Sequence, residues 1–216
     1  MDTIRILLAD DHTVVRDGLR VLLERQPGFE IAGEASDGIE AVRIAEETSP
    51  DIVLMDIAMP LLNGIEATRR IVAKHPKTGV LILSMHHDES YVLRSLNAGA
   101  RGYLVKDSAK GDLINGIRAV HEGRSFLSPK VSRLLQDDHL RRLQSKGIDD
   151  SYELLTSRER EILQLVAEGK TNKEIANVLN ISPYTIDTHR THILQKLNLH
   201  SAPELILYAV RKGIIS

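Results

Sequence analysis

The sequence contains no cysteine, and this absence limits its chemistry. Without thiols the chain can form no disulfide, no zinc–thiolate site and no cysteine nucleophile, and a cytoplasmic location fits that composition. No apolar run approaches the roughly 18 residues that a membrane-spanning helix needs. The first residues also lack a basic segment followed by an apolar one. We therefore expect neither a membrane span nor a signal peptide.

The chain also lacks a strong charge of one sign, because its formal net charge is −2 over 216 residues. Residues 1–128 hold 15 Lys and Arg against 19 Asp and Glu. The corresponding counts are 5 against 4 for residues 129–150 and 8 against 7 for residues 151–216. A bulk basic field is excluded, so any affinity for DNA must come from local placement of charge.

Glycine-rich nucleotide-binding loops are a third absence. Neither G-x-G-x-x-G nor G-x-x-x-x-G-K-[ST] follows the first apolar run of the chain. Asp10, Asp11 and His12 occupy that turn instead, and acids repel phosphate unless a metal bridges the two. A nucleotide-binding sheet is therefore set aside.

What the first 128 residues do contain is an alternation of short apolar runs with amphipathic stretches. Val15, Leu19 and Leu22 recur at helical spacing between two such runs. The runs have the length of strands and lie at 4–9, 30–35, 51–56, 80–85 and 101–105. Alternating strands and helices predict an α/β fold, a doubly wound five-stranded parallel sheet with both faces covered.

Residues 129–150 change character, being charged and poor in core-sized clusters. They form either a helical connector or a flexible linker with a partly helical start, and the composition does not separate the two. The helical alternative rests on four leucines, Leu134, Leu135, Leu140 and Leu143.

Residues 151–216 show no strand alternation and predict an all-α unit of four helices. Thr156-x-x-Glu159 and Thr171-x-x-Glu174 are capping-box patterns that open helices. Ser182-Pro183 marks another helix start, and a last helix from about 202 to 212 ends at a glycine. We expect its apolar residues to lie mostly in the core, with a few of them pairing with a second copy of the chain: Leu205, Leu207, Ala209 and Val210.

Polar residues end four of the predicted strands, where an open parallel sheet binds its ligands. These residues are Asp10 and Asp11 after the first strand, Asp56 after the third, Ser84 at the fourth and Lys106 after the fifth. Three clustered carboxylates repel one another unless a cation intervenes, and Mg²⁺ suits an all-oxygen site. An aspartate can also accept a phosphoryl group covalently, with a lysine and a hydroxyl holding the phosphoryl oxygens.

Each of these residues alone has a simpler explanation, such as a turn, a surface ion pair or a satisfied carbonyl. All five at the ends of the right strands favour the functional interpretation. With this pattern the sequence resembles the receiver domain of two-component response regulators over about residues 4–122. "MPLLNG" at 59–64 is similar to the loop that follows the phosphorylated aspartate in that family.

The resemblance implies a flavodoxin-like fold, with Asp56 phosphorylated by a sensor histidine kinase. It implies that Asp11, Asp56 and the Ala58 carbonyl bind Mg²⁺ directly, and that Asp10 does so partly through water. Tyr103 falls at the aromatic switch position of the family. The chain is then a phosphoryl acceptor with slow self-dephosphorylation rather than an enzyme.

In the tail, the segment 172–199 has the form of a helix, a short turn and a second helix. A recognition helix presents its first residues to the major groove, while exposed helix N-termini suit DNA phosphates. The candidates for the phosphates are Thr171, Asn172 and Lys173. The candidates for the groove are Tyr184, Thr185, Asp187, Thr188, Arg190 and Thr191.

Residues 155–199 resemble the LuxR-type helix-turn-helix, and together with the receiver they have the architecture of the NarL/FixJ transcription regulators. The resemblance implies double-stranded promoter DNA as a partner and a homodimer in the phosphorylated state. Asp187 departs from the basic residue usual there, and Ala202 from a frequent arginine. Asp187 either accepts from cytosine N4 or only stabilises the first turn of its helix.

Two other classes of function stay open. The receiver could be an interaction module attached to a structural bundle, an alternative favoured by the weak basicity of residues 151–216. A Mg²⁺-dependent hydrolase ranks lower, because no second general acid is evident. Metal binding by His189-x-x-His192 or His86-His87 lacks a third clustered ligand and is not expected.

Overall fold

The chain divides into two compact units, Met1–Lys146 and Gly147–Ser216, and each is described by itself. The computed structural model describes residues 3–85, 88–108, 110–133, 135, 151–199 and 201–215. Most of the proposed connector, including Leu134, Leu140 and Leu143, lies outside these residues, as does the histidine pair at 86 and 87. Within the described part, residues 129–133 and 135 are helical.

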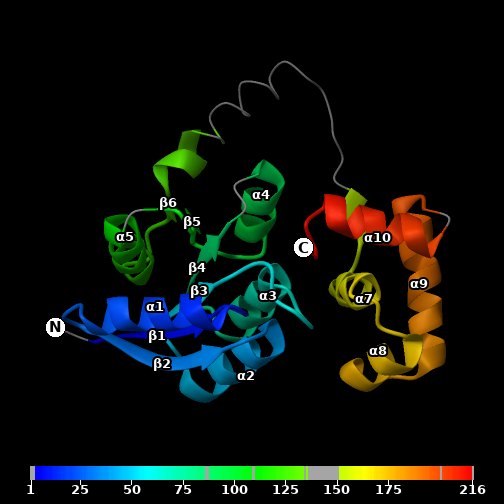
Figure 1. Cartoon of the computed structure of the whole chain (residues 1–216), viewed down its shortest axis with the longest axis horizontal. Helices are drawn as coiled ribbons and strands as arrows, with labels where there is room; N and C mark the ends of the chain where they lie inside the picture. Colours follow the sequence, from blue (N-terminus) through cyan, green and yellow to red (C-terminus); the bar gives the residue numbers. More distant parts are fainter. Residues whose placement is uncertain are drawn as a thin grey trace. The chain divides into compact units, whose positions relative to one another are not determined.

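The first unit is a parallel sheet with strand order β2-β1-β3-β4-β5-β6, covered by helices on both faces (Figure 1). Its strands are β1 (Ile4–Ala9), β2 (Phe29–Ala35), β3 (Ile52–Met55), β4 (Gly79–Ser84), β5 (Gly102–Val105) and β6 (Phe126–Leu127). Its helices are α1 (Thr13–Glu24), α2 (Gly38–Thr48), α3 (Gly64–Lys74), α4 (Glu89–Asn97) and α5 (Lys110–His121). The predicted doubly wound α/β fold is confirmed.

The predicted number of strands, five, was wrong by one, because β6 adds a sixth. β6 pairs in parallel with Gly102 and Tyr103 of β5. The amide of Phe126 donates to the Arg101 carbonyl at 3.0 Å, and the amide of Ser128 donates to the Tyr103 carbonyl at 3.0 Å. A strand of two residues is too short to show an alternating pattern in the sequence. β6 is therefore recognised only from its pairing with β5 in the structure.

Two hydrophobic clusters hold the sheet, one on each face. Alternation along β1 sends Ile6 and Leu8 to the cluster that contains α5 side chains such as Ile117. It sends Leu7 to the other cluster, which contains α2, α3 and α4 side chains such as Val92. Strands buried on both faces explain the near-continuous apolar runs of the sequence.

The second unit is helical, as predicted. It consists of a 3-10 turn η1 (Ser151–Leu154) and the helices α7 (Ser157–Ala167), α8 (Asn172–Leu179), α9 (Pro183–Leu197) and α10 (Ala202–Arg211). Both capping boxes are present, and Ser182 caps α9. Leu205 and Ala209 are buried, whereas Leu207 and Val210 are 56% and 51% exposed, so only two of the four lie in the core. No helix in the described part of the chain could cross a membrane.

Candidate functional site

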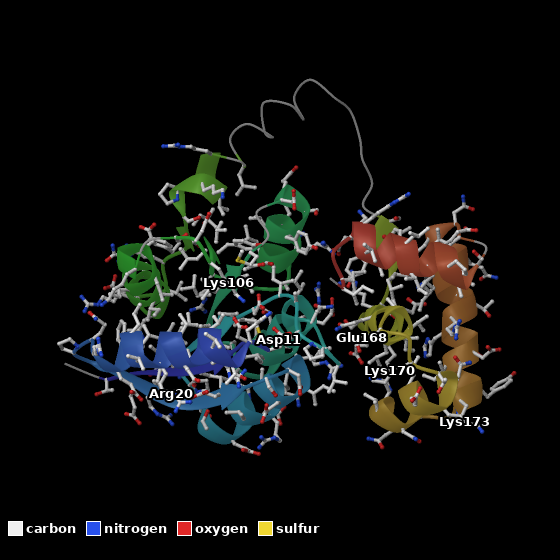
Figure 2. The ribbon with its side chains drawn as sticks, in the orientation of Figure 1. Asp11, Arg20, Lys106, Glu168, Lys170 and Lys173 are labelled. Carbon is white, nitrogen blue, oxygen red and sulfur yellow. The ribbon has the colours of Figure 1, made fainter. Side chains whose placement is uncertain are left out.

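The ends of β1, β3, β4 and β5 bring the predicted acidic residues, hydroxyl and lysine to one edge of the sheet. Figure 2 shows Asp11 and Lys106 at this edge. The strand register explains the convergence, because Ala9 pairs with Met55 and Ser84 pairs with Val105. Asp10, Asp56 and Lys106 follow Ala9, Met55 and Val105 directly, so they lie in one crevice with Ser84, the last residue of β4.

Lys106 is the cation at the centre of this cluster. Its Nζ lies 2.6 Å from Asp10 Oδ2 and 3.0 Å from Asp56 Oδ2. Asp10 and Asp56 are 2% and 4% exposed. Burial raises the pKa of the Asp56 carboxyl; Lys106 opposes this rise and Asp10 adds to it. Burial lowers the pKa of Lys106, but hydrogen bonds to the two carboxylates outweigh that effect and keep the ammonium charged.

The same edge offers oxygen ligands for a divalent cation. Ligand atoms of Asp10, Asp11, His12 and Asp56 all lie within 4.8 Å of one another. Three carboxylates against one lysine leave an excess of negative charge, which Mg²⁺ would neutralise while keeping several waters. Asp11 has a side chain that is 31% exposed, so the cluster opens to solvent on its side. The donor set therefore fits a magnesium ion.

His12 and Arg16 border the cluster and were not among the predicted site residues. His12 Nδ1 lies 2.7 Å from Asp11 Oδ1, and its place next to Asp11 in sequence could have indicated this contact. Arg16 Nη1 donates to the Asp10 carbonyl at 2.6 Å, and its Nε lies 3.5 Å from Glu34 Oε2. No sequence pattern links Arg16 to that carbonyl. Both residues hold the turn after β1 in place.

The loop after Asp56 is tightly packed against the backbone of that residue. The Ile57 amide donates to Asp56 Oδ1 at 2.8 Å. A Cβ added at Gly64 would lie 1.8 Å from the Asp56 carbonyl oxygen, so this close approach requires glycine. Asn63 Oδ1 caps α3 by accepting from the amides of Ile65 and Glu66. Ala58 lies in this loop, two residues beyond Asp56.

Ser84 and Tyr103 form a buried pair beside the acidic cluster. Both are 0% exposed, and their side chains share a hydrogen bond. Burial raises the pKa of the Tyr103 hydroxyl above its usual range, so the ring stays neutral and keeps its O–H. The predicted switch residue is thus in direct contact with the predicted phosphoryl-holding hydroxyl.

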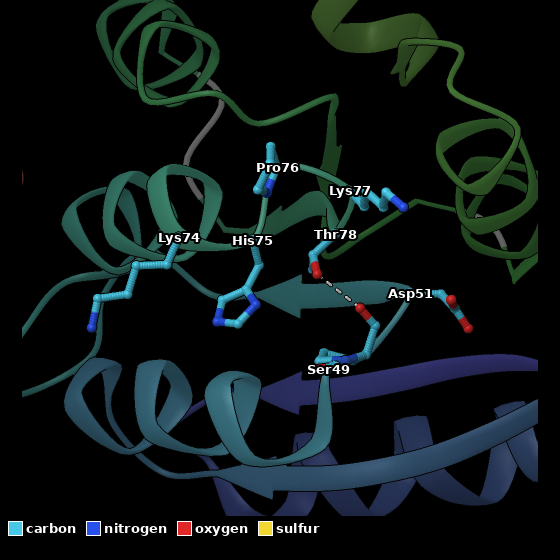
Figure 3. A pocket seen from close by; sticks show the side chains of 8 residues that line it. Ser49, Asp51, Lys74, His75, Pro76, Lys77 and Thr78 are labelled. Atoms are coloured by element: carbon cyan, nitrogen blue, oxygen red, sulfur yellow. Dashed lines mark hydrogen bonds between the residues drawn. The ribbon is translucent and has the colours of Figure 1, made fainter.

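A second hollow of about 400 Å³ lies at the opposite edge of the sheet (Figure 3). Three of its polar side chains are engaged in structural contacts. The hydroxyl of Thr78 donates to the Pro50 carbonyl, and Asp51 Oδ2 accepts from the Arg5 amide. Lys74 pairs with Glu46. This hollow assembles no reactive set.

In the second unit, most of the predicted DNA-facing residues are exposed. Tyr184 is 82% exposed at the start of α9, and Lys173 projects from the start of α8 (Figure 2). The hydroxyls of Thr188 and Thr191 donate to carbonyls one turn earlier in their own helix. Six of the predicted residues are exposed, namely Thr171, Lys173, Tyr184, Asp187, Thr188 and Thr191. The other three are partly buried, namely Asn172, Thr185 and Arg190.

Asn172 connects the two helices. Arg190 Nη1 donates to Asn172 Oδ1 at 2.7 Å, and Asn172 Nδ2 lies 3.5 Å from Asp187 Oδ1. Thr171 is committed to the capping box, where its hydroxyl contacts Glu174 Oε2 at 2.7 Å. The predicted DNA-facing residues are therefore not independent of one another, because hydrogen bonds between α8 and α9 join Asn172 to Arg190 and Asp187.

Comparisons with known proteins give matches to both units. Residues 6–118 match the family described as response regulator receiver domain, and residues 153–209 match the one described as bacterial regulatory proteins, luxR family. The oxygen regulatory protein NreC of Staphylococcus carnosus is 40% identical over 214 residues, which cover 98% of this chain and 99% of that protein.

Solved structures of the response regulator RcsB are similar along nearly the whole chain. A complex of RcsB with DNA has a TM-score of 0.60 at 26% identity, covering 97% of this chain and 98% of that one. A structure of two RcsB dimers bound to two parallel DNAs has a TM-score of 0.61 at the same identity and coverage.

Proposed function

The chain belongs to the NarL/FixJ family of response regulator transcription factors, and we propose that phosphorylation of Asp56 by a sensor histidine kinase switches its binding to promoter DNA. The observation that carries this proposal is the arrangement of Lys106 between Asp10 and Asp56, with Asp11 at the open side. A buried aspartate that is incompletely neutralised is suited to accept a phosphoryl group.

In the proposed reaction a carboxylate oxygen of Asp56 attacks the phosphorus of a phosphohistidine, forming a P–O bond while the P–N bond breaks. Asp10, Asp11, Asp56 and the Ala58 carbonyl would hold Mg²⁺, which supplies charge neutralisation for the incoming phosphoryl oxygens. Lys106 supplies a second positive charge at the same edge of the sheet. Its hydrogen bonds to two carboxylates already orient it.

The proposed switch uses the Ser84–Tyr103 pair. A phosphoryl group on Asp56 adds up to about two negative charges and three acceptor oxygens, which compete for the Ser84 hydroxyl. Tyr103 would then lose or change its buried hydrogen bond, and β5 would repack around it. Because β6 pairs with Tyr103 in the sheet, that repacking would reach the segment that leads to the tail.

We further propose that the active form is a homodimer in the cytoplasm that binds DNA through α8 and α9. The dimers in the RcsB–DNA structure support this assembly for a protein of the same architecture. α10 carries exposed apolar side chains, of which Leu207 and Val210 are more than half exposed, and a second copy would cover them. All nine predicted DNA-facing residues remain candidates for the interface.

Treatment with acetyl phosphate and Mg²⁺ tests the acceptor directly. Intact-mass spectrometry should show one added phosphoryl group on the wild type and none on Asp56→Asn. The matched control is Asp17→Asn, because Asp17 lies on α1 with a side chain that is 62% exposed. Equal phosphoryl uptake by Asp56→Asn and the wild type would refute the proposal.

One observation favours a rival function in which the tail is a structural bundle. Asp187 is exposed at the position from which a recognition helix would read DNA, and it repels phosphates. Gel shifts of the phosphorylated chain against genomic fragments discriminate the two. Binding that weakens steeply with salt supports DNA recognition, and no binding supports the rival.

A further inference from the structure

We propose that Asn172, the first residue of α8, is a positioning residue for base readout: it fixes Arg190 and Asp187 so that the two read one G·C base pair. This inference rests on the proposed DNA binding and assigns Asn172 a role other than a phosphate contact. It is carried by the hydrogen-bonded chain Arg190–Asn172–Asp187 that crosses from α9 to α8 and back.

The amide of Asn172 is suited to this position because it offers an acceptor and a donor at once. Its Oδ1 accepts from Arg190 Nη1 at 2.7 Å, and its Nδ2 lies 3.5 Å from Asp187 Oδ1. Asp187 and Arg190 are three residues apart on α9, a spacing at which opposite charges normally pair directly. The amide between them holds each charged group on a neutral partner.

The groups that remain open match the edge of a G·C pair. With Nη1 of Arg190 bonded to Asn172, its Nε and Nη2 still form a fork of donors, which guanine O6 and N7 accept. Asp187 retains Oδ2, an acceptor for the cytosine N4 amino group. One G·C pair presents both sets in the major groove. In this arrangement Asp187, the unusual acid on α9, contacts a base and not a phosphate.

The neighbours of Asn172 supply the phosphate contacts instead. Lys173 is exposed next to it and carries the charge that a DNA backbone attracts. Asn172 is only partly exposed, and both ends of its amide face α9 side chains. Its loss should therefore change which sequence is preferred more than how strongly DNA of any sequence is bound.

The test selects bound sequences from a randomised duplex pool with the phosphorylated full chain. The variants are the wild type, Asn172→Ala, Arg190→Ala and the double variant. Asn177→Ala is the matched control, because Asn177 is exposed on the same helix. We expect the wild type to prefer G·C at one position of each half-site by on the order of 10-fold.

Asn172→Ala and Arg190→Ala should each lose that preference, and the double variant should lose no more than either alone. Asn177→Ala should keep it, and Asn172→Ala should lose more affinity for the preferred sequence than for unrelated DNA. Asp187→Asn provides a second test. It should reduce the preference for G·C at the same position of the half-site, while the fold is unchanged.

A preference that survives in Asn172→Ala, or a loss of affinity that is equal for all sequences, would overturn the inference but leave DNA binding intact. If the wild type itself enriches no sequence and binds no DNA, the proposed function fails as well. The two failures are distinguishable because the second is seen before any variant is made.

Discussion

Each unit of the chain buries a carboxylate against a lysine, and the two pairs behave in opposite ways. Asp56 Oδ2 lies 3.0 Å from Lys106 in the first unit. Glu159 Oε2 lies 2.7 Å from Lys196 in the second. The acid side chains are 5% and 3% exposed. Yet the pKa of Asp56 is raised above its ordinary value, whereas that of Glu159 is lowered.

The difference lies in the other neighbours of each acid. Burial raises the pKa of both, and the lysine lowers it in both. Glu159 also accepts the Thr156 amide at 2.7 Å as part of a capping box, so its charge is well satisfied. Asp56 also accepts one backbone amide, that of Ile57, but it faces Asp10, a second acid that shares the same lysine. Glu159 has its lysine to itself, whereas Asp56 must share its lysine with another carboxylate.

Removing the two lysines should separate these cases most strongly. Lys106→Met leaves two buried carboxylates without their cation, and the free energy of unfolding should fall by about 3–5 kcal/mol at neutral pH. Lys196→Met leaves Glu159 with its backbone donor, and Lys196 is more exposed, so the loss should be about 1 kcal/mol. Denaturant unfolding of the full chain, with hydrogen exchange to assign the transition to a unit, measures both.

A control for this experiment is the pair Asp10→Asn with Lys106→Met. Removing one of the two buried carboxylates should recover part of the stability lost in Lys106→Met, because Asp56 then repels Asp11 alone rather than Asp10 and Asp11 together. Equal losses in Lys106→Met and Lys196→Met would break the distinction between the two sites.

The acidic edge could be predicted from sequence because strand ends are topological features. Once short apolar runs indicate a parallel sheet, Asp10, Asp56 and Lys106 must meet at its carboxyl edge whatever the details of packing. The capping boxes of α7 and α8 were predictable for a similar reason, since both partners lie within four residues of sequence.

What could not be predicted depends on contacts between distant side chains. Lys196 meets Glu159 across 37 residues of sequence, and Asn172 meets Arg190 across 18. Arg16 reaches the Asp10 carbonyl from one turn inside α1. None of these contacts leaves a periodic or local pattern, because each is fixed by how two elements pack. The sequence also did not separate the buried apolar residues of α10 from exposed ones such as Leu207, because an apolar residue on a helix surface looks the same in sequence as a core residue.

Asp56→Asn should sharpen the comparison by stabilising the protein. A raised folded-state pKa means that ionised Asp56 opposes folding, so the contribution of this group favours folding below its ordinary pKa of 3.8 and is lost as pH rises through the folded value. At pH 7 without Mg²⁺, the asparagine variant should therefore be more stable than wild type by about 1–3 kcal/mol. The gap should close in acid. Added Mg²⁺ should stabilise the wild type more than the variant if the proposed site binds it.

Glu159→Gln should show the opposite sign over the same range of pH. A lowered folded-state pKa means that ionised Glu159 favours folding above its ordinary value of 4.5, and that this contribution is lost as pH falls through the folded value. The glutamine keeps an acceptor for the Thr156 amide but loses the charge that pairs with Lys196, so stability at pH 7 should drop by about 1 kcal/mol. As pH falls through the folded value, the variant and the wild type should converge. Urea unfolding at pH 7 and at a series of acidic pH values measures both effects, and a variant as stable as wild type at pH 7 would show that Glu159, like Asp56, is not fully compensated.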